Sequence, residues 1–314
     1  MVRYQPIDAF RGIAILGMVF FTVTLRLSSN LPDILRHNVW GSVHIGDFIL
    51  PMFLFASGLS LAYYLEKKDK DKKSMLFKKV VRRFITLALI GISLSIFSAY
   101  GFLEMDEVML NAILFICCVA LSKLNWKIIL CIIFIINLSY IALLQPDKLD
   151  IFVGHYLGGY PAALYYLPVM LAGLVIGKEI ISNGLWSRKN KLFIFIIFVF
   201  FIFFTIFIPL NKMTASPSFV MLSILFSFLV LAIVNSIMSI NKSLNILEYF
   251  GRKPLRYWLI MYIIFIIPLW FYIEFSKQSL PLNIMWYLAI FISLGIIIIF
   301  FIISRIIEYI AISN

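Results

Sequence analysis

Long apolar runs, separated by short charged or turn-forming connections, limit what this chain can fold into more than any other feature of its sequence. The stretches "FILPMFLFASGLSLAYYL" and "FISLGIIIIFFII" are typical. A helix needs about 20 mostly apolar residues to cross a bilayer, so such runs predict membrane-spanning helices. Of the 314 residues, 63% are hydrophobic and 13% are charged, whereas soluble domains have about 45–50% apolar and about 25% charged residues. We therefore predict an integral membrane protein.

The apolar runs predict an all-α, polytopic transmembrane helix bundle of about ten spans, formed by a single domain over residues 1–314. The fourth and fifth runs are short and separated only by "SKLNW", which suits a tight helical hairpin. The predicted spans cover residues 10–28, 44–65, 80–100, 107–122, 127–144, 163–178, 191–210, 217–239, 254–273 and 284–307.

The distribution of basic residues predicts the orientation of these spans. The connection "EKKDKDKKSMLFKKVVRRF" carries nine Lys and Arg, and connections rich in these residues remain in the cytoplasm. The N-terminus is then cytoplasmic, every second connection is external, and 22 of the 27 basic residues lie inside. The basic residues on the outer side are Arg26, Arg36, Lys148, Lys212 and Lys277. We expect a multi-pass protein of the plasma membrane that contacts the lipid bilayer along its length.

The formal net charge of +12 would suit nucleic-acid binding if the basic residues gathered on one soluble surface. They lie instead mostly in short connections between apolar runs, where they orient the spans and contact lipid headgroups. We predict no nucleic-acid partner. A homodimer is compatible with the sequence, which carries no signal for or against it.

The stretch "RHNVWGSVHIGDFILP" places titratable groups at the mouth of the second predicted span. A carboxylate at membrane depth costs about 2.5–3.5 kcal/mol at the helix centre and less near the interface, so Asp47 should face the bundle interior and have a partner. Pro51 cannot donate to the carbonyl of residue 47, which predicts a kinked or open helix there. Either His37 or His44 could pair with Asp47 and act as a general base. Alternatively, Asp47 is a buried hydrogen-bonding group that stabilises the kink.

No metal site is expected from these residues. The spacing from His37 through His44 to Asp47 matches no common zinc pattern. Cys117, Cys118 and Cys131 lie inside apolar runs without ligand spacing and are most simply buried hydrophobic residues.

Two motifs carry a resemblance to a known family. The first span contains "IDAFRGIAILGMVFF", and the following loop and span read H-x2-W-x6-D-x3-P-x-F-x-F-x2-G. These resemble the patterns "LDxFRGIAIxxM" and "HxxWNGLTxADLVFPxFxFxxG" of the catalytic domain of heparan-α-glucosaminide N-acetyltransferase, part of a larger set of membrane-embedded acyltransferases. The match is close over residues 1–65, and "GRKPLRYWLIMYII" resembles a later element of the family. Here Gly41-Ser42 replaces an Asn-Gly pair, and His44 replaces a small polar residue.

The resemblance implies an acyltransferase that moves an acyl group, most simply acetyl, from cytosolic acetyl-CoA to an extracytoplasmic amino sugar or glycan. In the family the loop histidine and the helix acid are assigned to acyl transfer, which implies His37 and Asp47 as the catalytic residues. His37 would accept the proton of the acceptor, and Asp47 would hold its ring and stabilise the imidazolium. Direct transfer and an acyl-histidine intermediate both fit these residues.

Five residues are expected to contact the acyl-CoA. Its phosphates would remain near the cytoplasmic rim, where Arg82, Arg83, Arg11 and Arg252 are the candidate cations, and Asn111 corresponds to part of the family's "LQR" element. For each arginine the alternative is anchoring of a helix end. Two loop residues, Trp40 and His44, are candidates for contact with the acceptor, although a tryptophan there also suits an interfacial anchor.

Two other classes of protein fit the same residues. A proton-coupled transporter, or a protein that handles lipids or glycans without acyl transfer, would use Asp47 and the histidines as a proton relay. The sequence shows no evident repeat of halves, which weakens this alternative. A scaffold protein would keep the fold and lack the chemistry. Uptake driven by a proton gradient, without consumption of an acyl donor, would distinguish the transporter from the enzyme.

Overall fold

The computed structural model describes residues 4–36, 43–67, 73–95, 107–143, 159–212, 214–240, 244–276, 280, 282 and 284–313. Within these ranges the regular secondary structure is helical and contains no strand, so the predicted all-α class is confirmed. A π-helical turn, Tyr262–Ile266, joins α10 to α11. The α-helices are α1 (Gln5–Leu27), α2 (Ile49–Lys67), α3 (Lys73–Ser95), α4 (Glu107–Leu121), α5 (Trp126–Leu143), α6 (Gly159–Asn183), α7 (Arg188–Phe207), α8 (Pro217–Ile240), α9 (Asn245–Arg252), α10 (Pro254–Met261), α11 (Ile267–Ser276) and α12 (Trp286–Ser313).

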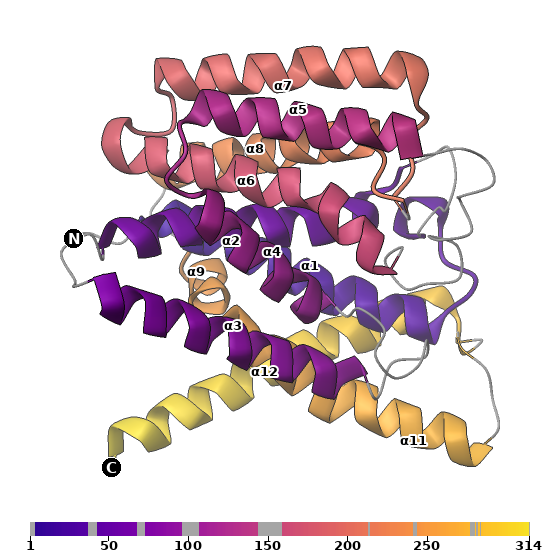
Figure 1. The fold of residues 1–314 in the computed structure, drawn as a ribbon. Coiled ribbons are helices and arrows are strands. Elements are labelled where there is room, and N and C mark those ends of the chain that lie inside the picture. Colours follow the sequence, from indigo (N-terminus) through magenta and orange to yellow (C-terminus); the bar gives the residue numbers. More distant parts are fainter. Residues whose placement is uncertain are drawn as a thin grey trace.

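The described part of the chain contains seven helical stretches that are long and apolar enough to cross a bilayer. They are Gln5–Leu27, Ile45–Glu66, Ala163–Asn183, Arg188–Phe207, Pro217–Ile240, Pro254–Ser276 and Trp286–Ile306. Helices α4 and α5 are apolar but shorter, and α3 carries several basic residues. The total of about ten spans and the cytoplasmic N-terminus therefore stay predictions. Helix α1 begins and α12 ends on the same side of the bundle (Figure 1), as an even number of crossings requires.

The helices are arranged in layers (Figure 1). Helices α5 to α8 pack together on one side of the molecule, and α3, α11 and α12 lie on the opposite side. Between them lie α1, α2 and α4 (Figure 1). Helix α1 contacts α8 and α12, α4 contacts α3 and α6, and α2 packs against α6 and α8. We call the end at which α1 begins the N-terminal end of the bundle. Helix α2 ends there and α3 begins there, whereas α2 starts at the opposite end.

Helices α2 and α6 pack with their backbones in close contact. A Cβ atom on Gly58 of α2 would lie 2.1 Å from the carbonyl oxygen of Met170, and one on Gly173 of α6 would lie 2.2 Å from that of Phe55. No residue with a side chain fits at such distances. Small residues at helix interfaces allow this close approach in membrane proteins, where packing and not water exclusion holds helices together.

Two elements differ most from the predicted spans, and α1, α6 and α12 also extend several residues beyond theirs. Helix α3 begins at Lys73, before the predicted start at residue 80, because its Lys- and Leu-containing first turns are good helix formers despite their charge. The short amphipathic helix α9 was not predicted, since its polar residues resemble a connection. It packs against α1, where a Cβ atom on Gly12 would lie 1.9 Å from the carbonyl oxygen of Leu247.

The outer helices expose apolar side chains. On α7 Phe195 is 62% exposed and Ile206 is 72% exposed, and α12 presents a comparable set of isoleucines. Helix α6, by contrast, is largely buried in the bundle. A soluble protein rarely exposes so much apolar surface. Exposed apolar side chains on the outer helices are instead expected where lipid surrounds the protein.

Candidate functional site

Asp47 lies fully buried at the entrance to α2. It belongs to a 3₁₀ turn, Ile45–Phe48, and its Oδ2 accepts a hydrogen bond from the backbone N–H of His44 at 2.9 Å. The α-helix proper begins at Ile49, which places Pro51 in the first turn. A proline is tolerated there because the first N–H groups of a helix have no intrahelical partner. The turn before the helix, and not a kink within it, accommodates Pro51.

The side-chain partner of Asp47 is Lys212, whose Nζ lies 3.3 Å from Oδ1. Lys212 belongs to the connection between α7 and α8, and its side chain is 11% exposed. The sequence indicated Lys212 only as one of the few basic residues on the outer side. Basic residues are rare on the predicted outer side, and a cation there does not help to orient the spans in the membrane. This rarity is the signal that could have singled out Lys212.

A network of hydrogen bonds holds Lys212 in place. The Tyr166 hydroxyl donates to the backbone carbonyl of Lys212 at 3.0 Å. The backbone N–H groups of Asn211 and Thr214 donate to Ser216 Oγ and to Asn211 Oδ1 at 2.9 and 3.2 Å. Burial lowers the pKa of the Lys212 ammonium below its ordinary value, and the charges of Asp47 and Glu107 oppose this effect. The Asp47–Lys212 pair is therefore a buried, well-ordered ion pair with a second carboxylate close by.

The histidines contribute less to this arrangement than the sequence suggested. His44 holds Asp47 through its backbone, and its ring Nδ1 has no hydrogen-bond partner among the described residues. The predicted catalytic base His37 and the candidate acceptor contact Trp40 lie outside the described residues. Their roles stay predictions.

A cavity of about 900 Å³ opens among α1, α2, α3, α4 and the α9–α10 region. All five residues predicted to contact acyl-CoA line it: Arg11, Arg82, Arg83, Asn111 and Arg252. Lys253 and Arg256, which the sequence analysis did not select, add two further cations. The described residues that line this basic cavity include no acid. Such an excess of positive charge around one cavity favours a ligand with several negative charges.

Inside the basic cavity, several polar groups are held in fixed positions. The Arg83 guanidinium lies over the ring of Phe115, 5.0 Å from its centroid, and Arg11 pairs with Asp8 at 3.2 Å. Asn111 is buried, and its Oδ1 has no hydrogen-bond partner among the described residues. The same is true of Nη1 of Arg256. Unpaired buried polar atoms are costly, so their presence in a cavity indicates groups that a ligand or water would satisfy.

Two helices connect the basic cavity with the Asp47–Lys212 pair. Helix α2 carries Asp47 at its start and lines the cavity from Phe53 to Tyr64. At a rise of about 1.5 Å per residue, the nearest lining residue lies about 9 Å along the helix from Asp47. Helix α4 makes a similar connection. The charge of Glu107, at its start, raises the pKa of Lys212, and Asn111, one turn later, lines the cavity. The cavity thus extends from the N-terminal end of the bundle toward the buried pair.

Metal ligands do not gather in the described part of the chain, where no group of three or more His, Cys, Asp or Glu side chains could hold an ion. The three cysteines are free, with Cys118 buried, Cys117 half-buried and Cys131 exposed.

Comparison with known proteins gives one result that bears on this site. No curated protein matches the chain. Residues 3–199 match the family described as heparan-alpha-glucosaminide N-acetyltransferase, catalytic. The match covers more than half of the chain and includes the two motifs around Arg11 and Asp47, as well as α3 to α6. The chain therefore belongs to the heparan-alpha-glucosaminide N-acetyltransferase catalytic-domain family.

Proposed function

We propose that this protein is a membrane-embedded acyltransferase that uses acetyl-CoA, or a related acyl-CoA, and transfers the acyl group to an amino sugar or glycan on the outer side of the plasma membrane. The observation that carries the proposal is the basic cavity. It brings together, from four different helices, the five residues that the sequence predicted as acyl-CoA contacts.

The charge of the cavity fits the donor. Acyl-CoA carries a pyrophosphate and a third phosphate at one end and an uncharged thioester arm at the other. The phosphates would lie among Arg82, Arg83 and Arg252, because guanidinium groups form paired hydrogen bonds with phosphate oxygens. The uncharged arm would pass along α2 toward Asp47, past the small side chains of Ser57 and Ala56, which line the cavity.

Asp47 suits the role of a positioning group for a catalytic base. Both of its oxygens are engaged, one by the His44 backbone N–H and the other by Lys212, which favours the carboxylate form. A carboxylate held in this way would orient the ring of His37 and stabilise its imidazolium as the acceptor loses a proton. General-base assistance of this kind contributes typically about 10²–10⁴-fold to the rate.

The test uses purified full-length protein in lipid nanodiscs, with acetyl-CoA as donor, glucosamine as acceptor, and release of free CoA as the readout. We expect turnover by the wild type, none by His37→Ala, and residual turnover by His44→Ala, whose backbone contact to Asp47 survives. Arg82→Gln should raise KM for acetyl-CoA more than it lowers kcat, because the phosphates remain bound during the reaction. Lys189→Gln, outside the cavity, is the matched control. A wild type that consumes no acetyl-CoA with any amino sugar would refute the proposal.

The second candidate is a proton-coupled transporter, which a buried Asp47–Lys212 pair also suits. Proteoliposomes distinguish the two. Solute uptake driven by a proton gradient, abolished by Asp47→Asn and independent of acetyl-CoA, would favour the transporter. Consumption of acetyl-CoA without a gradient favours the enzyme.

A further inference from the structure

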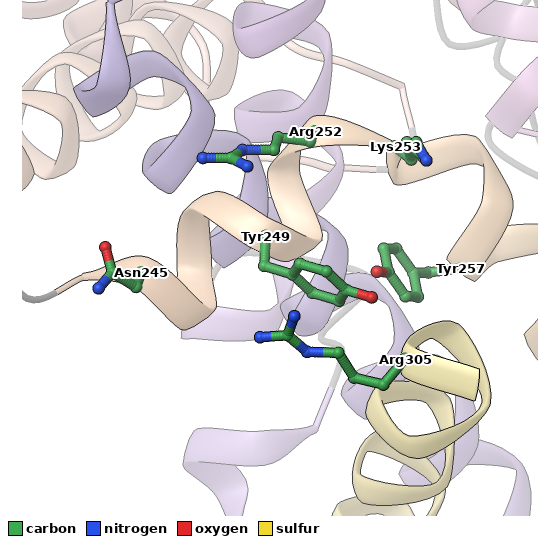
Figure 2. A pocket seen from close by; sticks show the side chains of 6 residues that line it. All are labelled: Asn245, Tyr249, Arg252, Lys253, Tyr257 and Arg305. Carbon is green, nitrogen blue, oxygen red and sulfur yellow. The ribbon is translucent and has the colours of Figure 1, made fainter. Parts of the chain in front are cut away.

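A second, smaller pocket lies between α9, the start of α10 and α12. It has a volume of about 350 Å³ and is lined by Asn245, Tyr249, Arg252, Lys253, Tyr257 and Arg305 (Figure 2). Arg252 and Lys253 also line the basic cavity, whereas the other four residues do not. The two spaces are therefore neighbours that can be probed separately through Arg305 on one side and Arg82 on the other.

The pocket is cationic, and the hydroxyl groups of its two tyrosines are hydrogen-bonded. The Arg305 guanidinium lies over the ring of Tyr249, 4.6 Å from its centroid, a contact that holds its charge at the pocket (Figure 2). The hydroxyls of Tyr249 and Tyr257 share Ser304 Oγ at 2.8 and 3.0 Å. Among the side chains described there, the acid is Glu248, which is buried and pairs with Arg252 at 3.5 Å. Among the described residues no carboxylate pairs with Arg305, so the pocket favours an anion.

A stripe of exposed isoleucines leads to this pocket along α12. Ile298, Ile302 and Ile306 follow one another at intervals of four residues and are 60%, 51% and 53% exposed. This spacing places them on one face of the helix, over a length of about 12 Å. Arg305 stands beside the last of them. A charged pocket at the end of an exposed apolar stripe has the two-part chemistry of a phospholipid, with an anionic headgroup and acyl chains.

We propose that this pocket binds the phosphate of an anionic phospholipid, whose acyl chains lie along Ile298, Ile302 and Ile306. The inference does not depend on acyl transfer. Free phosphate shares the headgroup chemistry but lacks the chains, so it is the alternative occupant that the experiment must separate. Because Arg252 and Lys253 belong to both spaces, a bound lipid also neutralises part of the rim of the basic cavity.

The experiment measures binding of dioctanoyl phosphatidylglycerol, dioctanoyl phosphatidylcholine and inorganic phosphate to the purified full-length protein in neutral detergent. We expect phosphatidylglycerol to bind more tightly than phosphatidylcholine and inorganic phosphate. Arg305→Gln should weaken phosphatidylglycerol binding roughly fivefold, the effect of one basic residue near a headgroup. Arg82→Gln, which changes a residue outside this pocket, should leave phosphatidylglycerol binding unchanged.

A second variant keeps the proposal testable if Arg305→Gln fails to fold. Ile302→Asn changes an exposed side chain and should weaken phosphatidylglycerol binding without affecting phosphate binding. Equal affinity for the two lipids, or wild-type affinity in both Arg305→Gln and Ile302→Asn, would overturn the proposal. Phosphate that binds as tightly as phosphatidylglycerol would identify a free-phosphate site and overturn the lipid assignment.

Discussion

Replacing Lys212 by methionine would leave the Asp47 carboxylate buried without its cation. Asp47 is fully buried and the Lys212 side chain is 11% exposed, with Nζ and Oδ1 3.3 Å apart. Removing one partner of such a buried pair costs about 3–5 kcal/mol, because the remaining charge lacks both water and a counterion. The His44 N–H still donates to Asp47 in the variant, so we expect a loss near the lower end of that range, about 3 kcal/mol.

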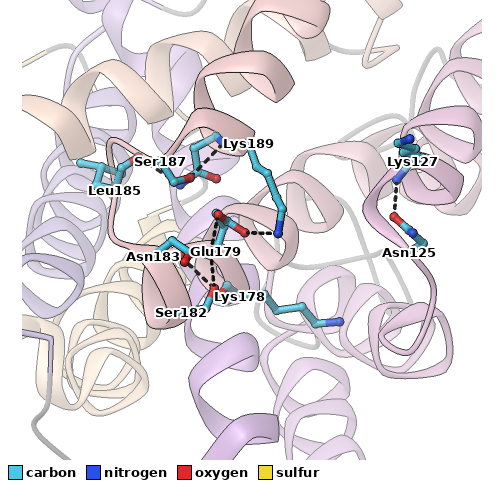
Figure 3. A network of polar contacts seen from close by, with 10 residues as sticks. Asn125, Lys127, Lys178, Glu179, Ser182, Asn183, Leu185, Ser187 and Lys189 are labelled. Carbon is cyan, nitrogen blue, oxygen red and sulfur yellow. Dashed lines mark hydrogen bonds and ion pairs between the residues drawn. The ribbon is translucent and has the colours of Figure 1, made fainter.

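The matched control is the pair between Lys189 and Glu179 near the α6–α7 connection (Figure 3). Its N···O distance of 3.4 Å is almost the same, but the Lys189 side chain is 59% exposed. An exposed cation contributes only about 0–1 kcal/mol to a pair, since water screens its charge. The Glu179 side chain is 11% exposed and keeps the hydrogen bond that Asn183 Nδ2 donates to it at 2.7 Å. The burial of the lysine, and not the distance, is therefore the variable that separates Lys212→Met from Lys189→Met.

Thermal unfolding in detergent, followed for the wild type and both variants, measures the difference. Lys212→Met should lower the unfolding midpoint by several times as much as Lys189→Met. The double variant Asp47→Asn with Lys212→Met should recover most of the loss, because a neutral amide can still accept the His44 N–H and leaves no buried charge. Equal midpoints for the two single variants, or a double variant less stable than Lys212→Met, would refute the reasoning.

Four further substitutions test other contacts. Gly58→Ala should lower the free energy of unfolding by about 1–3 kcal/mol, because its Cβ would lie 2.1 Å from a carbonyl oxygen of α6. A Cβ on Gly295 would have no atom within 4 Å. Gly295→Ala should therefore stabilise α12 by about 0.5–1 kcal/mol in the same unfolding assay. Asn111→Leu should weaken acetyl-CoA binding about tenfold in equilibrium titrations, the loss of one hydrogen bond in a buried site. Tyr166→Phe removes the 3.0 Å bond to Lys212 and should cost about 1 kcal/mol of stability.

Most of the helices could be predicted from the sequence because lipid imposes a strong and simple pattern. The predicted span 217–239 matches α8 (Pro217–Ile240) within a residue, since polar connections bound a continuous apolar run. The prediction was less accurate where charge and helix coincide. Helix α3 extends back to Lys73, and α9 forms within a basic connection. The sequence assigned both segments to connections because they are charged, but Lys, Arg and Glu are also good helix formers.

The candidate site was predictable in part. Arg11, Arg82, Arg83 and Arg252 were predicted from their place at the expected cytoplasmic rim and Asn111 from a family element, and the fold places all of them around one cavity. Lys253 and Arg256 were not selected, because a sequence cannot show that the α9–α10 turn closes the same space. The partner of Asp47 was sought among nearby histidines, whereas Lys212 is 165 positions away in the chain. Only the packing of α2 against α6 and α8 brings them together.

The small residues of α2 explain how one helix can both pack tightly and border a large cavity. Gly58 and Ala62 face α6, where a Cβ on Gly177 would lie 2.8 Å from Cβ of Ala62. Ala56, Ser57 and Ser60 face the basic cavity instead. Short side chains on the first face draw α6 close and fix the position of α2, and short side chains on the second leave space that larger residues would fill. Because Asp47 lies in the 3₁₀ turn directly before α2, the rigid attachment of α2 to α6 also fixes the distance between the buried ion pair and whatever occupies the cavity.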